Sequence, residues 1–74
     1  MPKLPRITAG EIISVLQKLG FSLSRQSGSH MIYKSADGKR VTVPFHAAKT
    51  LHPKVLKSIL RDANLSVARL QELL

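Results

Sequence analysis

The stretch HMIYKSADGKRVTV, residues 30–43, decides the fold that we expect for this chain. Apolar and polar residues alternate on both sides of Ala36-Asp37-Gly38, which is the pattern of two half-buried strands joined by a tight turn. A three-residue turn, with its glycine in the left-handed conformation, aligns the apolar residues of both strands on one face. The predicted cross-strand pairs are Tyr33 with Val41 and Met31 with Val43. The stretch therefore predicts an antiparallel hairpin with one buried face and one open face.

A further strand precedes this hairpin, because Phe21 and Leu23 show the same alternation with polar neighbours. Turn-forming residues separate the two strands, and a three-residue turn at Gln26-Ser27-Gly28 again brings apolar residues together. The predicted pairs are Leu23 with Met31 and Phe21 with Tyr33, and Ser24 then lies opposite His30 on the open face.

A helix is expected before these strands. Residues 1–7 contain two prolines and predict an extended lead-in. Thr8 and Glu11 then form the spacing of a capping box, and Gly20 provides a stop signal, so the first helix covers roughly residues 8–19. Its apolar face consists of Ile12, Val15, Leu16 and Leu19.

Two more helices are expected after the strands. Phe45 continues the buried series of the last strand, and the chain then turns through residues 45–49. Thr50 and His52 are alternative N-caps for the second helix, and Asn64 fits its C-cap. Ser66 begins a short third helix. The predicted core faces are Val55, Leu56, Ile59, Leu60 and Ala63 in the second helix, and Val67, Leu70 and Leu74 in the third.

The predicted fold is α+β, in the order helix, three-stranded antiparallel sheet, helix and short C-terminal helix. Two helices can cover one face of such a sheet and leave the other exposed. This is the layout of double-stranded-RNA-binding domains, which recognise RNA by its shape and backbone. We expect residues 1–74 to form a single domain, since 74 residues support only one thin core.

The net charge of +8, from 12 Lys and Arg against 4 Asp and Glu, predicts a polyanionic partner. Nucleic acid is the first candidate, and an anionic membrane or an acidic protein are the alternatives. The candidate phosphate-binding residues fall into two sets. Arg25, Lys34, Lys39 and Arg40 surround the open face and its turns, whereas Lys49, Lys54, Lys57 and Arg61 follow the second helix and its approach.

Several classes of function find no support in the sequence. The chain has no Cys, so disulfides, a thiolate nucleophile and Cys-type zinc sites are excluded. No pair of carboxylates is placed for two-metal or glycosidase chemistry, and we expect neither a metal nor a cofactor. Since no segment resembles a signal peptide or a membrane span, we expect a cytoplasmic protein without a membrane partner.

The histidines are the candidates for acid–base chemistry. His30 on the open face can exchange protons with RNA, whose 2′-OH attacks the adjacent phosphate once its proton is removed. The alternative is an ordinary exposed strand residue. His46 lies just past the last strand, near His30 in the predicted register, and is a candidate second acid or base; a plain loop histidine is the favoured alternative. His52 is expected to help begin the second helix.

Four motifs resemble the HicA toxin family. The segment Gly28-Ser29-His30-Met31-Ile32-Tyr33 is similar to the family's Gly-(Ser/Thr)-His-x-x-Tyr, and residues 19–21 match the Leu-Gly-Phe that precedes it. Residues 43–46 match Val-Pro-x-His, and residues 59–66 match Ile-Leu-(Arg/Lys)-x-Ala-x-Leu-Ser. The motifs occur in the family's order and spacing over nearly the whole chain.

This resemblance implies a double-stranded-RNA-binding-like fold and the activity of an mRNA interferase, a toxin that cuts RNA. It implies that His30 is the catalytic histidine, within a motif that includes Gly28 and Ser29. It also implies a HicB-like antitoxin that blocks the toxin in a tight complex. His46 matches a recurrent family position, and the second proton-transfer group remains His46, a lysine or water. The competing hypotheses for the function are a non-catalytic RNA-binding module and a domain that binds an acidic protein.

Overall fold

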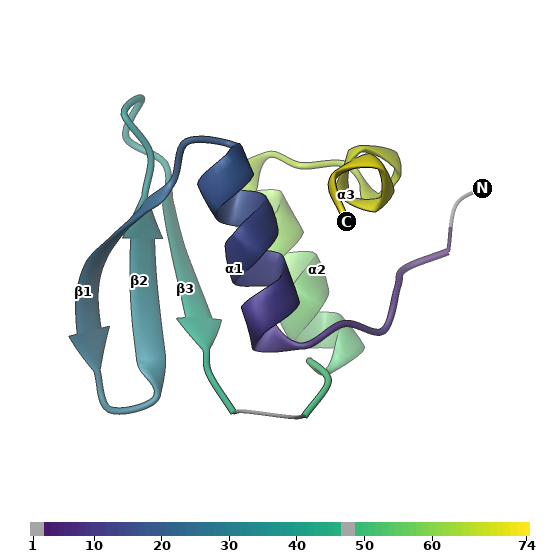
Figure 1. Ribbon diagram of the computed structural model, residues 1–74, viewed down its shortest axis with the longest axis horizontal. Coiled ribbons are helices and arrows are strands. Elements are labelled where there is room, and N and C mark those ends of the chain that lie inside the picture. The colour runs from purple at the N-terminus through teal and green to yellow at the C-terminus, as the bar shows by residue number, and fades with distance from the viewer. Residues whose placement is uncertain (1–2, 47–48) are drawn as a thin grey trace.

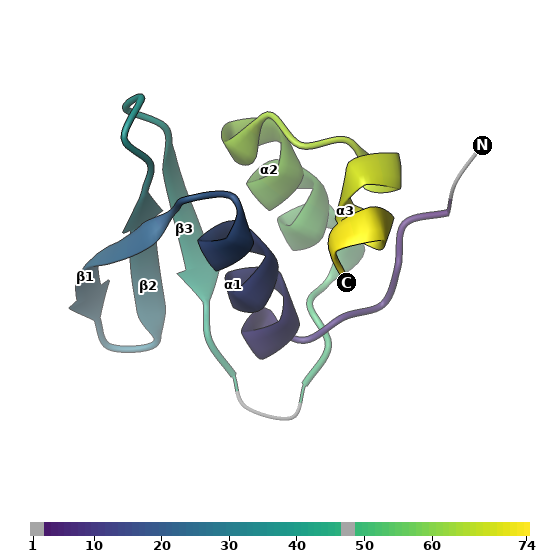
Figure 2. The ribbon, with the colours of Figure 1, turned by 45° about the horizontal axis from the view of Figure 1, so that its top comes forward.

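The computed structural model describes residues 3–46 and 49–74 (Figure 1). In these residues the elements are α1 (Ala9–Lys18), β1 (Ser22–Ser27), β2 (His30–Lys34), β3 (Arg40–Pro44), α2 (Pro53–Ala63) and α3 (Val67–Leu73). The strands form one antiparallel sheet in the order β1-β2-β3. The helices lie together on one side of the sheet, and β1 is the strand farthest from them (Figures 1 and 2). The predicted α+β arrangement is confirmed.

The core lies between β3, the middle of the sheet and the helices. The sheet contributes Tyr33, Val41 and Val43, all nearly inaccessible to solvent. Burial raises the pKa of the Tyr33 hydroxyl, since the ionised form would lose its hydration. The helices contribute Ile12, Val15, Leu16, Leu56, Ile59, Leu60, Ala63 and Leu70. The core is thin because β1 makes no part of it.

Local signals in the sequence begin and end each helix as expected. Thr8 and Glu11 form the capping box of α1, and Gly20 follows the helix with φ of 93°. His52, not Thr50, is the N-cap of α2, and Asn64 ends it in the left-handed conformation. Ser66 caps α3 through a bond from the Arg69 backbone N–H.

The β2–β3 hairpin has the predicted register. Tyr33 pairs with Val41, and Met31 pairs with Val43. The Ser35 N–H donates to the Lys39 carbonyl oxygen over 3.0 Å, which closes the three-residue turn, and Gly38 has φ of 90°. The alternation of apolar residues was informative here because the helices bury one face of this hairpin.

The β1–β2 register prediction was wrong. Gly28 and Ser29 alone form the turn, with Gly28 at φ of 57° as in a type II′ turn, so Ser27 lies opposite His30. Ser24 falls in a bulge between Leu23, which pairs with Tyr33, and Arg25. Phe21 precedes the strand and packs in the core. The pattern failed because every residue of β1 is exposed, so burial does not constrain its register.

Three apolar residues predicted to be buried are exposed. Leu23 is 48% exposed because the helices do not extend over β1, and Phe45 is 38% exposed because β3 ends at Pro44. Leu74 follows the last residue of α3 and is 50% exposed, whereas Leu73 packs against the core. In each case the apolar pattern of the sequence continues past the residues that pack against the core.

Backbone contacts join the segment before α1 to the segment before α2. Thr8 and Thr50 form an isolated β-bridge, and the Leu51 N–H donates to the Ile7 carbonyl oxygen over 2.7 Å. These bonds hold the start of α2 beside the start of α1. As a result the β1–β2 turn, the end of β3 and the start of α2 all lie at one end of the molecule (Figure 1). The parts of the predicted lead-in and turn at residues 1–2 and 47–48 lie outside the described residues.

The same substitution at two glycines should have opposite effects. Gly28→Ala places a Cβ in the left-handed region and should lower the free energy of unfolding by about 1–2 kcal/mol. Gly10→Ala adds a Cβ whose nearest neighbour, Thr8 Oγ1, is 3.9 Å away, and should raise stability by about 0.4–1 kcal/mol. Urea unfolding of both variants measures this. Equal effects would show that the Gly28 turn does not require a positive φ.

Candidate nucleic-acid interface

The face of the sheet away from the helices presents three close cross-strand pairs. Hydrogen bonds from Phe45 N to Ser29 O (2.6 Å) and from Ser35 N to Lys39 O bracket the β2–β3 ladder. The intervening open-side pairs are therefore the non-hydrogen-bonded ones, in which Cα atoms are about 4.5 Å apart. These pairs are His30 with Pro44, Ile32 with Thr42, and Lys34 with Arg40. Together with Arg25 and Ser27 of β1 they form what we call the open face.

Lys34 and Arg40 place two positive charges directly opposite one another. Both residues are exposed, and such a like-charged pair destabilises a sheet. Arg25, opposite Ile32, adds a third cation to the same face. The four carboxylates of the chain lie elsewhere, at the α1 cap, in the β2–β3 turn and on the later helices. An anion bound across this face would relieve the repulsion, so the open face is suited to a phosphate backbone.

His30 lies at one end of the open face, four residues from Lys34 along β2. It is the first residue of β2 and is exposed. Ser27 lies opposite it on β1 and Pro44 on β3. Because the Gly28-Ser29 turn and two neighbouring strands hold its backbone, the imidazole is presented from a rigid position. Imidazole can accept or donate a proton at neutral pH, so His30 can act on a group bound beside the cations.

The other histidines lie near the start of α2. His46 follows Pro44, the partner of His30, by two residues, and it is exposed. His52 is the N-cap residue, and its Nδ1 accepts a hydrogen bond from the Lys54 N–H over 3.1 Å. His46 and His52 line one pocket together with Lys49. The sequence pattern did not reveal this pocket, because residues 46 and 52 come together only through the loop that leads into α2.

The predicted α2 set of cations is exposed along that helix and its approach. Lys49 and Lys54 lie at the start of α2, at the same end of the molecule as the first residue of β2 (Figure 1). Lys57 lies one turn further on, and Arg61 is paired with Asp62 over 3.7 Å. The early α2 cations therefore lie at the His30 end of the molecule, whereas Lys34 and Arg40 lie at the other end of the β2–β3 ladder.

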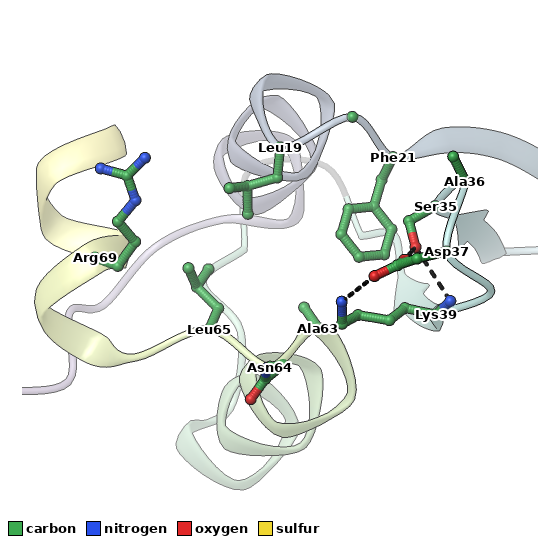
Figure 3. Close-up of a pocket in the computed structure, with 11 residues that line it drawn as sticks. Leu19, Phe21, Ser35, Ala36, Asp37, Lys39, Ala63, Asn64, Leu65 and Arg69 are labelled. Atoms are coloured by element: carbon green, nitrogen blue, oxygen red, sulfur yellow. Dashed lines mark hydrogen bonds and ion pairs between the residues drawn. The ribbon is translucent and has the colours of Figure 1, made fainter.

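Lys39 lies next to Arg40 but, unlike Arg40, it is paired with a carboxylate. Its ammonium binds the Asp37 carboxylate, which also accepts from the Ser35 hydroxyl (Figure 3). These residues border a pocket of about 460 Å³ between the β2–β3 turn and the C-terminal end of α2. This pocket lies at the end of the sheet opposite His30, since β2 begins at His30 and runs toward the turn.

Within the described part of the chain, no three His, Cys, Asp or Glu side chains gather as a metal site would require. Nor does any helix of the described residues have the length and apolar character needed to cross a membrane.

Comparison with known families identifies the chain. The family model described as the HicA toxin of bacterial toxin-antitoxin matches residues 9–65. The chain belongs to the HicA toxin family. No curated protein matches it at a significant level. The HicA match runs from the first residue of α1 to the residue after the C-cap of α2, and therefore includes His30, the whole sheet and the start of α2.

Because Arg40 lies opposite Lys34, we expect Arg40 to destabilise this HicA toxin. Arg40→Thr removes the repulsion with Lys34 and should raise the free energy of unfolding by about 0.2–1 kcal/mol at low salt. Arg25→Thr is the matched control, because Arg25 faces Ile32 rather than a charge. Urea unfolding at low and high salt measures both variants. The advantage of Arg40→Thr should shrink at high salt, and an equal gain in both variants would contradict the repulsion.

The turn at the other end of the sheet should respond to acid. The Lys39 ammonium and the Ser35 hydroxyl lower the pKa of Asp37 from 3.8 to about 2. Because the folded-state pKa is depressed, the stability contributed by Asp37 is present above pH 3.8 and is lost as the pH falls toward about 2. The stability difference between wild type and Asp37→Asn should therefore shrink over this interval. Thermal unfolding measures it, with Asp62→Asn as control, and a constant difference would contradict the assignment.

Proposed function

We propose that this HicA toxin is a metal-independent endoribonuclease, an mRNA interferase, in which His30 transfers protons at the RNA backbone. The observation that carries the proposal is the position of His30, exposed at the edge of a rigid sheet face that presents Arg25, Lys34 and Arg40. Membership of a toxin family supports it, because cutting mRNA is an activity through which a small basic domain can stop growth.

The proposed reaction uses the 2′-OH of RNA as the nucleophile. Removal of its proton lets the 2′-oxygen form a bond to the adjacent phosphorus, and the bond from phosphorus to the 5′-oxygen breaks. The products are a 2′,3′-cyclic phosphate and a 5′-hydroxyl, which receives a proton from the acid. His30 is the base or the acid in this reaction. Arg25, opposite Ile32, is the open-face cation nearest to His30 and is proposed to stabilise the charge that develops on the phosphate.

The second proton-transfer group is proposed to be His46. It follows Pro44, the cross-strand partner of His30, by two residues and so lies just beyond the end of β3. A lysine or a water molecule are the alternatives. Arg25, Lys34 and Arg40 are proposed to hold the RNA backbone from the sheet, and Lys49, Lys54 and Lys57 from the α2 side. Lys39 contributes less, because Asp37 already pairs with its charge.

The partner that neutralises the toxin is proposed to be a HicB-like antitoxin. It would bind the toxin, which is proposed to be a single domain, in the cytoplasm. The family is one of toxin-antitoxin systems. The open face, cationic and uncovered by the helices, offers a surface where an acidic partner would also exclude RNA.

The second candidate function is a non-catalytic RNA-binding module, since the same cations would hold RNA without any proton transfer.

Removal of the imidazole should abolish cutting and leave binding nearly intact. We expect His30→Ala and the similarly sized His30→Gln to reduce the rate of RNA cleavage in EDTA by about 10²–10⁴-fold. Incubation with a long RNA, followed by gel analysis and by labelling of 5′-hydroxyl ends, measures the rate and the chemistry. Arg25→Thr is the control for phosphate binding, because it should weaken the affinity for RNA without changing how the cleavage rate depends on pH.

Two outcomes would redirect the assignment. If wild type and His30→Ala both retard RNA on a gel without cutting it, the chain is an RNA-binding module. If His30→Ala cuts at the wild-type rate, the catalytic group is elsewhere, and His46→Ala becomes the decisive variant.

A further inference from the structure

A second pocket lies where β3 ends and α2 begins. The proposed function gives roles to His46 and Lys49, which line it, but assigns no ligand to the pocket itself. Its volume is about 280 Å³. Pro44, Leu51 and Val55 provide apolar walls. The polar groups come from His46, Lys49, Thr50 and His52. This volume is close to the lower end of small-ligand sites, which span about 300–1,000 Å³. The pocket is therefore large enough for one flat ring system and too small for a folded segment.

The pocket adjoins His30 through a single residue. Pro44 lines the pocket and is also the cross-strand partner of His30. Because this is a non-hydrogen-bonded pair, the two Cα atoms are separated by about 4.5 Å. A nucleotide whose phosphate lies against His30 would therefore have a neighbouring base within reach of the pocket. The position argues for a part of the same RNA rather than for an unrelated ligand.

The polar groups of the pocket are mainly hydrogen-bond donors. Since the Nδ1 of His52 accepts from the Lys54 N–H, the proton of the neutral ring is on Nε2, which can only donate. The Lys49 ammonium is a donor without acceptor capacity. No Asp or Glu is among the described residues that line the pocket. The Thr50 hydroxyl and the His46 imidazole can each donate and accept, so donors outnumber acceptors and a ligand rich in acceptors fits best.

We propose that this pocket binds one base of the RNA, next to the phosphate at His30, and that it prefers the carbonyl-bearing bases guanine and uracil. The proposal rests on the proposed ribonuclease function. Guanine presents O6 and N7 as acceptors, and uracil presents two carbonyl oxygens. Adenine and cytosine place an amino group where the pocket places donors, so hydrogen-bonding groups on both sides would be left unpaired. The apolar walls and the histidine rings provide surfaces against which a base can stack.

Sequencing the ends produced from a random RNA pool tests this preference. Wild type should cut with at least about a tenfold enrichment of guanine or uracil at one position beside the cut. Val55→Phe fills the pocket and should reduce this enrichment to less than twofold while cutting continues. Val67→Phe is the matched control, because Val67 is likewise half-buried against the core but lies on α3, and it should keep the wild-type preference.

Three results would overturn the proposal. The first is a wild type that cuts without a base preference, or with a preference for adenine or cytosine. The second is an unchanged preference in a folded Val55→Phe variant. The third is an equal loss of preference in both variants. In each case RNA is still cut, so the ribonuclease function stands while the base pocket fails.

Binding of mononucleotides tests the pocket without cleavage. Guanosine and uridine 3′-monophosphates should shift the amide resonances of Leu51 and Val55 in NMR spectra. Adenosine 3′-monophosphate and inorganic phosphate should shift them at least about tenfold more weakly at equal concentration. If these shifts occur in a chain that cuts no RNA, the ribonuclease proposal fails and the pocket stands. Shifts confined to the open face, or equal shifts with phosphate alone, would overturn the pocket.

Discussion

The register between β2 and β3 is the constraint on which the rest of the structure depends. Pairing Tyr33 with Val41 and Met31 with Val43 directs one series of side chains toward α1 and α2. Each fully buried side chain of this kind contributes about 1.5–3 kcal/mol. A slip by one residue would expose this series and bury charged residues instead, so the register is strongly determined. The same constraint forces the alternate residues outward as close pairs.

The outward pairs explain why the candidate site has a cost in stability. With the apolar series buried, Lys34 and Arg40 have no alternative to lying opposite one another, and each repels the other. The chain accepts this repulsion although its core is thin and its length is only 74 residues. On this surface the positive charges repel one another in the free protein, and a bound anion would relieve that repulsion. Such an arrangement is typical of a binding site rather than of a solvated surface.

The charged residues differ in whether they are paired with an opposite charge. Asp37 and Lys39 neutralise one another at the β2–β3 turn, where they also rigidify the hairpin. His30 lies at the opposite end, near the cations of early α2, whereas Lys34 and Arg40 of the open face lie beside the turn. The β-bridge between Thr8 and Thr50 holds the start of α2 beside the start of α1, and α2 also packs against β3. A polyanion that contacts both groups of cations would extend along the open face past His30.

The sequence by itself determined the helices, the β2–β3 hairpin and the outward position of His30, because caps, turn glycines and a half-buried alternation are local signals. Only the tertiary structure decided the β1–β2 register, where Ser27 rather than Ser24 lies opposite His30. No helix of the described chain covers β1, so hydrophobicity carried no information about its pairing, and the turn at Gly28 set it instead. The pocket shared by His46 and His52 is likewise tertiary, since the packing of α2 against β3 creates it between segments that no periodicity relates.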